Sequence, residues 1–201
     1  MAQEFSVIHI IGDSVKIQRR GVTLLDYHYN PDVPQMESPK PYIDPLCTPA
    51  GDVVTLDRPH DHVWHRGLYF GWAHVNDQNF WGGATYLREV GYRQLDNNGA
   101  QTHEAWERLE QDPGGVWMVE RLAWTSFAGE RWIDERRTIR VHPVTDESEL
   151  LLTIETEITP SPGQGPFVFG SPTTNGRPAA GYSGLTIRMP RSMNYGAIAI
   201  S

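Results

Sequence analysis

The feature that most constrains this chain is an alternation of apolar and polar side chains in residues 149–158, ELLLTIETEI. Leu152 and Ile154 fall on one side of an extended backbone there, and Glu155 and Glu157 fall on the other. Successive side chains of a strand point to opposite faces, so a period of two is typical of a strand that is buried on one face only. The segment therefore predicts a half-buried strand.

Two more segments predict neighbouring strands. The runs at 116–124 and 130–141 are rich in β-branched and aromatic residues, and the turn sequence DPGG at 112–115 precedes the first. We expect these runs to pair antiparallel. Trp117 and Trp132 lie within them, and we expect both rings to fill the core.

The rest of the chain carries short β-like runs and no sustained helical period. FSVIHII, VKIQ, VTLLDYHY and YIDPL are separated by Gly, Pro and Asp, which favour turns over continuous elements. Together the runs predict an all-β chain of about ten to twelve strands, forming an antiparallel two-sheet sandwich. A length of 201 residues fits one domain, residues 1–201.

Three long polar loops and the end of the chain interrupt this pattern. The loops lie at 30–41, 94–103 and 171–181, and long loops in small domains are more often functional than not. Strand-like passages begin at 182–190 and 196–201, and the second stops without a cap or turn. An exposed terminal strand leaves an unpaired sheet edge. We expect either a second copy of the chain to cover this edge, giving a homo-oligomer, or the sequence to be an incomplete piece of a longer domain.

Composition excludes two classes of partner. Asp and Glu number 25 against 17 Lys and Arg, giving a formal net charge of −8, so we expect no binding to nucleic acid, which needs clustered basic residues. No apolar run approaches the roughly 18 to 20 residues that span a bilayer, so we expect no membrane partner. The single Cys47 cannot form an intrachain disulfide, and the start of the chain lacks the pattern of a signal peptide. We therefore expect a cytoplasmic location.

Three of the eight histidines gather in residues 59–72, PHDHVWHRGLYFGW. If the segment is extended, His60 and His62 point to one face, and the glycine at 67 would permit a turn that brings His65 to join them. Three imidazoles with an open coordination position suit a divalent metal such as zinc. Two alternatives stay open: metal-free proton transfer or hydrogen bonding by the imidazoles, and histidines that only hydrogen-bond backbone carbonyls to hold the loop.

Other side chains near this cluster complete a candidate site. We expect His62 and His65 to be catalytic, Asp61 to orient an imidazole, and Arg66 to bind an anionic or carbonyl oxygen. Trp64, Trp72 or Trp81 would supply a face on which a substrate ring stacks. Further candidates for substrate binding are His74, Asn76, Asn97, His103 and Arg177.

Residues 40–55, 59–83, 94–103 and 169–185 resemble a bacterial family labelled "methane oxygenase PmoA". The resemblance implies a soluble β-rich domain, similar to the galactose-mutarotase type of sandwich and associated with carbohydrate metabolism. The motif that carries over, DHxxHRGL, falls on Asp61, His62, His65, Arg66, Gly67 and Leu68.

These observations leave three functions open. The first is an enzyme that acts on a sugar or an oxidised sugar derivative by hydrolysis, elimination or isomerisation. The second is a carbohydrate-binding module without catalysis, and the third is a structural domain that builds an assembly. In the first two the partner is a small-molecule sugar or sugar derivative.

Overall fold

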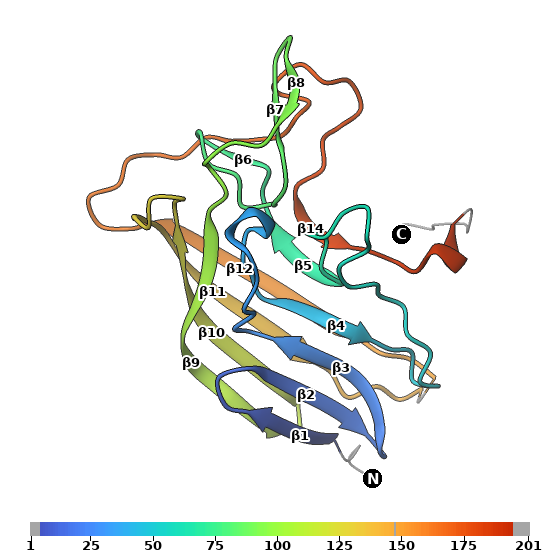
Figure 1. Cartoon of the computed structure of the whole chain (residues 1–201). Coiled ribbons are helices and arrows are strands. Elements are labelled where there is room, and N and C mark those ends of the chain that lie inside the picture. The colour runs from blue at the N-terminus through green and yellow to red at the C-terminus, as the bar shows by residue number, and fades with distance from the viewer. Residues whose placement is uncertain (1–4, 147, 195–201) are drawn as a thin grey trace.

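The chain is all-β in a computed structural model that describes residues 5–146 and 148–194 (Figure 1). Besides strands, this part of the chain contains two short 3₁₀ turns, Gln35–Glu37 and Arg191–Met193. None of its elements is a helix with the length and apolarity needed to cross a membrane. The strand expected at 196–201 lies outside the described residues.

The larger sheet has six antiparallel strands in the order β1-β2-β3-β4-β5-β14. They are β1 (Phe5–Ile10), β2 (Ser14–Arg19), β3 (Val22–His28), β4 (Tyr42–Leu46), β5 (Leu68–Gly71) and β14 (Gly184–Ile187). Short turns join the first three strands, as is usual for antiparallel neighbours. In contrast, β14 pairs with β5 although the two are far apart in sequence, and this pairing builds one end of the sheet.

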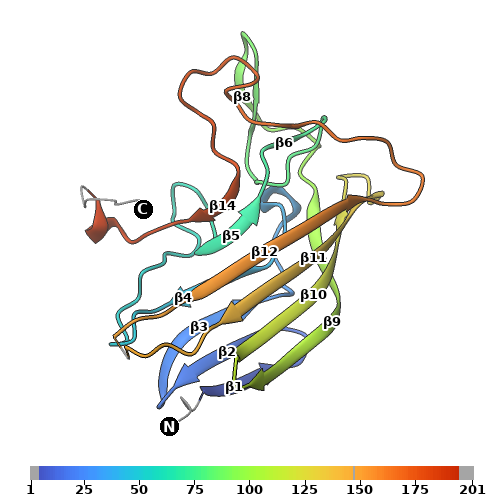
Figure 2. The ribbon, with the colours of Figure 1, turned by 180° about the vertical axis from the view of Figure 1, so that it is seen from behind.

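The smaller sheet has four antiparallel strands in the order β12-β11-β10-β9 (Figure 2). They are β9 (Ala100–Asp112), β10 (Gly115–Thr125), β11 (Arg131–Val141) and β12 (Leu152–Pro160). The predicted pairing of 116–124 with 130–141 is confirmed as β10 with β11. The strand predicted from the alternation at 149–158 is confirmed as β12, which starts later, at Leu152.

Four very short strands complete the described structure. They are β6 (His74–Val75), paired with β13 (Phe169–Gly170), and β7 (Thr85–Leu87), paired with β8 (Gly91–Arg93). These pairs stand beyond one end of the sandwich, at the top of Figure 1. They raise the number of strands in the described residues to fourteen, above the predicted ten to twelve, because segments of only two or three residues carry no periodic signal.

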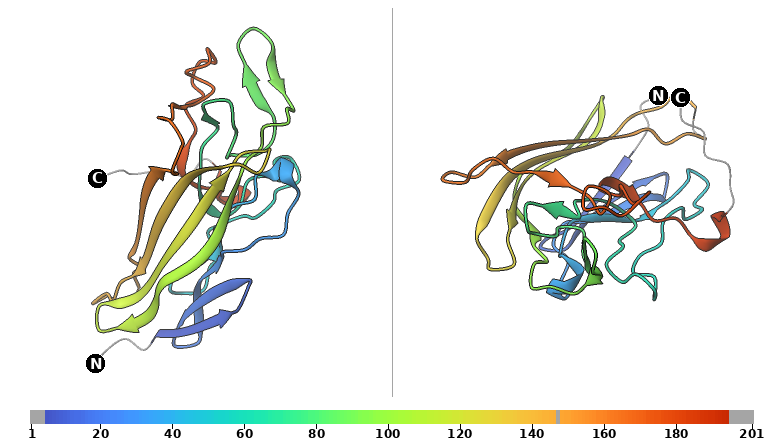
Figure 3. Two further views of the ribbon diagram at one scale, coloured as in Figure 1. Left: turned by 90° about the vertical axis from the view of Figure 1, so that its left-hand side faces the viewer. Right: turned by 90° about the horizontal axis from the view of Figure 1, so that it is seen from above.

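The predicted two-sheet sandwich is confirmed, and the two views in Figure 3 show its layers. Apolar side chains from both sheets meet between them, among them Ile17 and Leu25 from the larger sheet and Met118 and Ile139 from the smaller one. A second cluster between the layers surrounds Trp124, whose side chain is fully buried.

The prediction that Trp117 fills the core is wrong, whereas Trp132 packs against the cluster around Trp124. Both side chains are only half-buried. The Trp117 ring is covered by the guanidinium groups of Arg108 and Arg140, whose Cζ atoms lie 4.4 and 4.1 Å from its centroid. Val116 and Met118 on either side of it are buried, so the pleat of β10 turns the Trp117 side chain away from the core.

Candidate functional site

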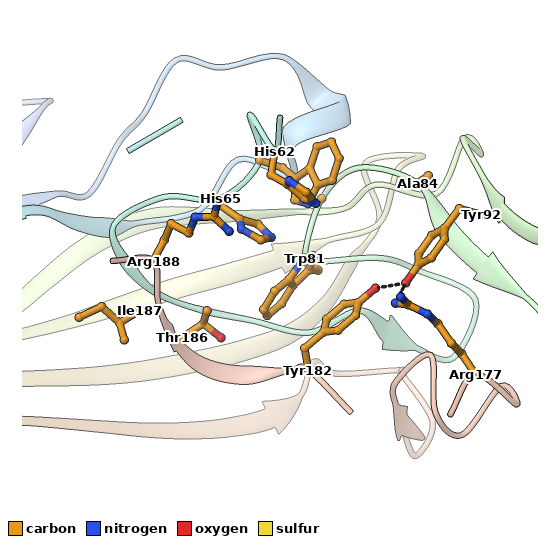
Figure 4. A pocket seen from close by; sticks show the side chains of 12 residues that line it. His62, His65, Trp81, Ala84, Tyr92, Arg177, Tyr182, Thr186, Ile187 and Arg188 are labelled. Atoms are coloured by element: carbon orange, nitrogen blue, oxygen red, sulfur yellow. Dashed lines mark hydrogen bonds between the residues drawn. The ribbon is translucent and has the colours of Figure 1, made fainter. Parts of the chain in front are cut away.

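A pocket of about 590 Å³ lies on the outer face of the larger sheet, where β5 meets β14 (Figure 4). Tyr69 of β5 and Thr186 of β14 are paired in register. Leu68 belongs to the core between the sheets, so alternation along β5 turns the Tyr69 side chain to the opposite face. The pocket is therefore built on the side of the sheet that does not face the sandwich core.

Aromatic side chains form the body of this pocket. Tyr42, Tyr69 and Trp81 make a separate buried cluster on the outer face, and Trp64 and Tyr182 pack against it. The ring centroids of Trp81 and Tyr182 are 5.0 Å apart, and those of Tyr69 and Trp81 are 5.3 Å apart. Trp64, Trp81 and Tyr182 line the pocket directly, which gives it large apolar walls.

The glycines of the sequence FWGG, residues 80–83, allow Trp64 to lie against the backbone. Gly83 has a φ of +69°, and a Cβ on it would come within 2.6 Å of the Trp64 ring. A Cβ on Gly82 would likewise come within 2.6 Å of the Cβ of Trp64. A side chain at either position would displace the indole, so the pair of glycines shapes this wall of the pocket.

The histidine segment is a turn and not an extended strand, so the expected metal geometry is wrong. The amide of His62 donates to the carbonyl of Pro59, and the amide of His65 donates to the carbonyl of His62, each at 2.9 Å. His60 is exposed and lies outside the pocket, because the turn separates it from His62. Across residues 5–146 and 148–194, no group of three His, Cys, Asp or Glu side chains is placed to hold a metal ion.

His62 and His65 both line the pocket, and their ring centroids are 4.9 Å apart. Burial, followed by electrostatic interaction with His62 and Arg188, lowers the pKa of His65 from 6.5 to about 4. His65 is therefore neutral at physiological pH. Its Nδ1 is buried without a hydrogen-bond partner in the described part of the chain.

Asp61 lies beside this pair, as expected for a residue that orients an imidazole. Its Oδ2 is 3.2 Å from Nδ1 of His62. The carboxylate is exposed, and it also lies 3.3 Å from Arg191 and 3.8 Å from Arg188. Asp61 thus stands at the margin of the pocket and does not line it.

Arg66 does not line the pocket, and its expected role in binding an anionic oxygen is not available to it. Its side chain is buried, with Nε 3.0 Å from Asp57 and Nη1 3.7 Å from the buried Glu37. Its Cζ lies 4.2 Å from the centroid of the Tyr42 ring. These contacts join the loop that carries the histidines to Tyr42 of β4 and to Glu37 of the first 3₁₀ turn.

Arg188 occupies the position that sequence reasoning gave to Arg66. It follows β14 directly, its amide donates to the carbonyl of Gly67 at 2.7 Å, and its carbonyl accepts from the amide of Leu56 at 2.8 Å. These bonds place its guanidinium at the end of the pocket that holds His65 (Figure 4). Gly67 permits this approach, since its φ is +30° and a Cβ would clash with the carbonyl of Ile43.

Lys40 fixes the floor of the pocket from inside the protein. It is fully buried, and its Nζ donates to the carbonyls of Glu37, Ser38 and Trp81, each at 2.9 Å. Burial, followed by the charge of Arg66, lowers the pKa of Lys40 from 10.5 to about 7. The side chain ties Trp81 to the 3₁₀ turn at Gln35–Glu37.

The opposite end of the pocket is formed by the β7–β8 hairpin and the loop at 171–181. Tyr92 and Tyr182 hydrogen-bond through their hydroxyls at 2.7 Å, and Arg177 donates to the Tyr92 hydroxyl. Burial, followed by the hydrogen bond with Tyr92, raises the pKa of Tyr182. Arg177 therefore lines the pocket, at the end distant from His65, and its predicted role in substrate binding stays a prediction (Figure 4).

The other residues predicted to bind substrate do not line the pocket, because each is engaged in the fold. Trp72 packs edge-on against Phe169, with ring centroids 5.1 Å apart. Asn76 accepts from the Val168 amide at 2.8 Å, at the turn that follows β6. His103 points to the interior of the sandwich, where its Nδ1 lies 2.6 Å from Glu120.

Two of these residues are buried around the pocket's supporting loops. Nδ1 of His74 lies 3.2 Å from the side-chain amide of Asn175. Asn97 donates to the carbonyl of Asp77 at 2.9 Å and accepts from the Thr85 hydroxyl at 3.1 Å. Their roles are structural contacts between loops.

Sequence reasoning missed several residues that line the pocket. They are Gly82, Ala84, Tyr92, Tyr182, Thr186, Ile187 and Arg188. Thr186 and Arg188 are two apart in a strand-like passage, which could have indicated a shared face. The sequence offers no signal that this face lies beside the histidine turn.

Comparison with known proteins identifies a family for the chain. The model of a family described as "Family of unknown function (DUF6807)" matches residues 14–200. No curated protein and no solved structure matches the chain. The resemblance to a methane oxygenase PmoA family is wrong, because the family that matches is a different one by description and nothing points to that label. The likeness to galactose mutarotase stays a prediction.

Proposed function

The chain belongs to the family of unknown function DUF6807, and we propose that it is an enzyme that acts on a sugar or an oxidised sugar derivative by proton transfer. The observation that carries the proposal is a neutral imidazole, His65, in a pocket whose walls are the aromatic rings of Trp64, Trp81 and Tyr182.

The shape of the pocket suits a small polar ring. Its volume of about 590 Å³ falls within the range of about 300 to 1,000 Å³ that is usual for small-molecule sites. Aromatic faces offer apolar contact to the C–H faces of a sugar, while Tyr92, Tyr182 and Thr186 offer hydroxyl groups to its edges. A sugar uses both kinds of surface at once.

The two imidazoles supply the chemistry. A neutral His65 has a free nitrogen lone pair and can accept a proton from a C–H or O–H group of the substrate. His62, whose Nδ1 is 3.2 Å from Asp61, is positioned to return a proton on the same side of the pocket. Removal and return of a proton by neighbouring groups is what elimination and isomerisation of an oxidised sugar require.

The test is turnover of a panel of keto-glycosides and sugar acids by the purified full chain, with products detected by NMR. We expect product from the parent protein, at least tenfold slower turnover in His65→Gln and His62→Gln, and no change in His60→Gln, the exposed control outside the pocket. Unchanged turnover in both pocket variants would remove these residues from the mechanism. Binding without any product would instead favour a carbohydrate-binding module.

The proposal extends to where the protein works. We propose a cytoplasmic protein. Its one cysteine, Cys47, is free and buried, and a free thiol is typical of a reducing compartment such as the cytosol. Cell fractionation with an antibody tests the location. Light scattering of the full chain tests the further proposal of a homo-oligomer, and a monomer would contradict it.

A further inference from the structure

The charges around the pocket are unbalanced. No Asp or Glu in the described part of the chain lines it, although Asp61 stands at its margin, whereas the guanidinium groups of Arg177 and Arg188 line its two ends. The lining thus contrasts with the formal net charge of the whole chain, −8. A concave site lined by two guanidinium groups and by no carboxylate favours a ligand that carries negative charge.

The two arginines differ in how far their hydrogen-bond donors are already engaged within the protein. Arg177 is engaged at the rim, where it donates to the Tyr92 hydroxyl and its Cζ lies 5.1 Å from the Tyr92 ring centroid. Among the described residues Arg188 has an ion pair with Asp61, and its length of 3.8 Å is beyond hydrogen-bond distance. Within the described residues, the Arg188 side chain makes no hydrogen bond, so its planar fork of donors remains open to a ligand.

Arg188 is nevertheless held firmly in place. Its backbone is hydrogen-bonded on both sides, to Gly67 and to Leu56. Only 28% of its side chain is exposed. Because the backbone is anchored and the side chain is partly buried, the guanidinium loses little conformational entropy when it binds an anion. This smaller entropy loss strengthens binding.

The layout of the pocket then orients the ligand. Figure 4 shows Arg188 and His65 at one end, Arg177 and Tyr92 at the other, and Trp81 and Tyr182 between them. A sugar ring that stacks on Trp81 and Tyr182 places one of its substituents toward Arg188 and His65. That substituent is the one that meets the open guanidinium.

We infer that the substrate is a carboxylated sugar, of the uronic or aldonic acid class, whose carboxylate is bound by Arg188 beside His65. The inference rests on the proposed function. A carboxylate matches one guanidinium fork with two parallel hydrogen bonds. A doubly charged phosphate is the poorer match, because one guanidinium fork engages only two of its terminal oxygens and the other lining arginine, Arg177, stands at the opposite end of the pocket.

The experiment is calorimetric titration of the full chain with three probes: D-glucuronate, D-glucose and glucose 6-phosphate. We expect glucuronate to bind at least tenfold more tightly than the other two. Arg188→Met should weaken glucuronate binding by roughly 10- to 100-fold and leave glucose binding nearly unchanged. Arg191→Met is the matched control, because Arg191 pairs with the same Asp61 but lies outside the pocket, and it should change both affinities by less than about threefold.

A third variant distinguishes the loss of the guanidinium contact from a general loss of folding. Arg188→Lys keeps the charge without the fork, so it should retain a preference for glucuronate over glucose that is smaller than that of the parent. Circular dichroism of each variant checks that the strands are intact.

The outcomes separate this inference from the proposed function. Equal binding of glucose and glucuronate, a preference for the phosphate, or an undiminished preference in both Arg188 variants overturns the carboxylate inference and leaves the sugar site standing. Failure of all three probes to bind the parent protein overturns both.

Discussion

The lowered pKa of His65 predicts a specific dependence of stability on pH. Burial and the positive groups around it bring this pKa from 6.5 to about 4. In the unfolded chain the imidazole takes up a proton near its ordinary pKa, so between these two values the unfolded state binds more protons than the native state does. Native stability therefore falls as the pH decreases through this window, and above it His65 contributes no pH dependence.

The size of the effect follows from the difference between the two pKa values. A difference from 6.5 to about 4 corresponds to about 3 kcal/mol of unfolding free energy. Because the imidazole is only half-buried, solvent screening reduces this, and we expect about 2 kcal/mol between about pH 7.5 and pH 4.5. Other groups also titrate in this range, so the measurement must be a difference between two proteins.

The assay is urea unfolding followed by tryptophan fluorescence, on the parent protein and on His65→Gln. Glutamine does not titrate, so the parent should lose about 2 kcal/mol more stability on acidification than the variant loses. His60→Gln, an exposed position, should follow the parent at every pH. If parent and His65→Gln lose stability in parallel, the surroundings of His65 do not lower its pKa, and the assignment of a depressed pKa to this imidazole is refuted.

Three further predictions concern the core and the walls of the pocket. Trp124→Ala should lower the unfolding free energy by about 3 to 5 kcal/mol, because it empties a fully buried site, and urea unfolding would show it. Lys40→Met should cost about 2 to 4 kcal/mol by the same assay, since it leaves three buried carbonyls without their donor. Gly83→Ala should displace Trp64 and weaken sugar binding in calorimetry, whereas Gly129→Ala, with a similar positive φ but open space around it, should not. Equal effects of the two glycine variants would contradict the role of Gly83 in shaping the pocket.

Part of the candidate site could be read from the sequence because it is local. His62, Trp64 and His65 lie within four residues, and Trp81 follows soon after, so their chemistry was visible as a cluster. Their geometry was not visible. The prediction of an extended segment failed because hydrogen bonds within the loop form a turn, which removes His60 from the group.

The sequence by itself determined the longer strands, their antiparallel sandwich and the gathering of His62, Trp64 and His65 in one segment. Alternation of side chains follows from the backbone geometry of a strand, so it is already present in a few consecutive residues. Only the tertiary structure decided which cation reaches the pocket. Arg66 is adjacent to His65 in sequence, but its ion pairs with Asp57 and Glu37 hold it beneath the loop. Arg188 reaches the pocket instead, because β14 pairs with β5, and such a long-range pairing depends on the packing of the whole chain and leaves no local pattern.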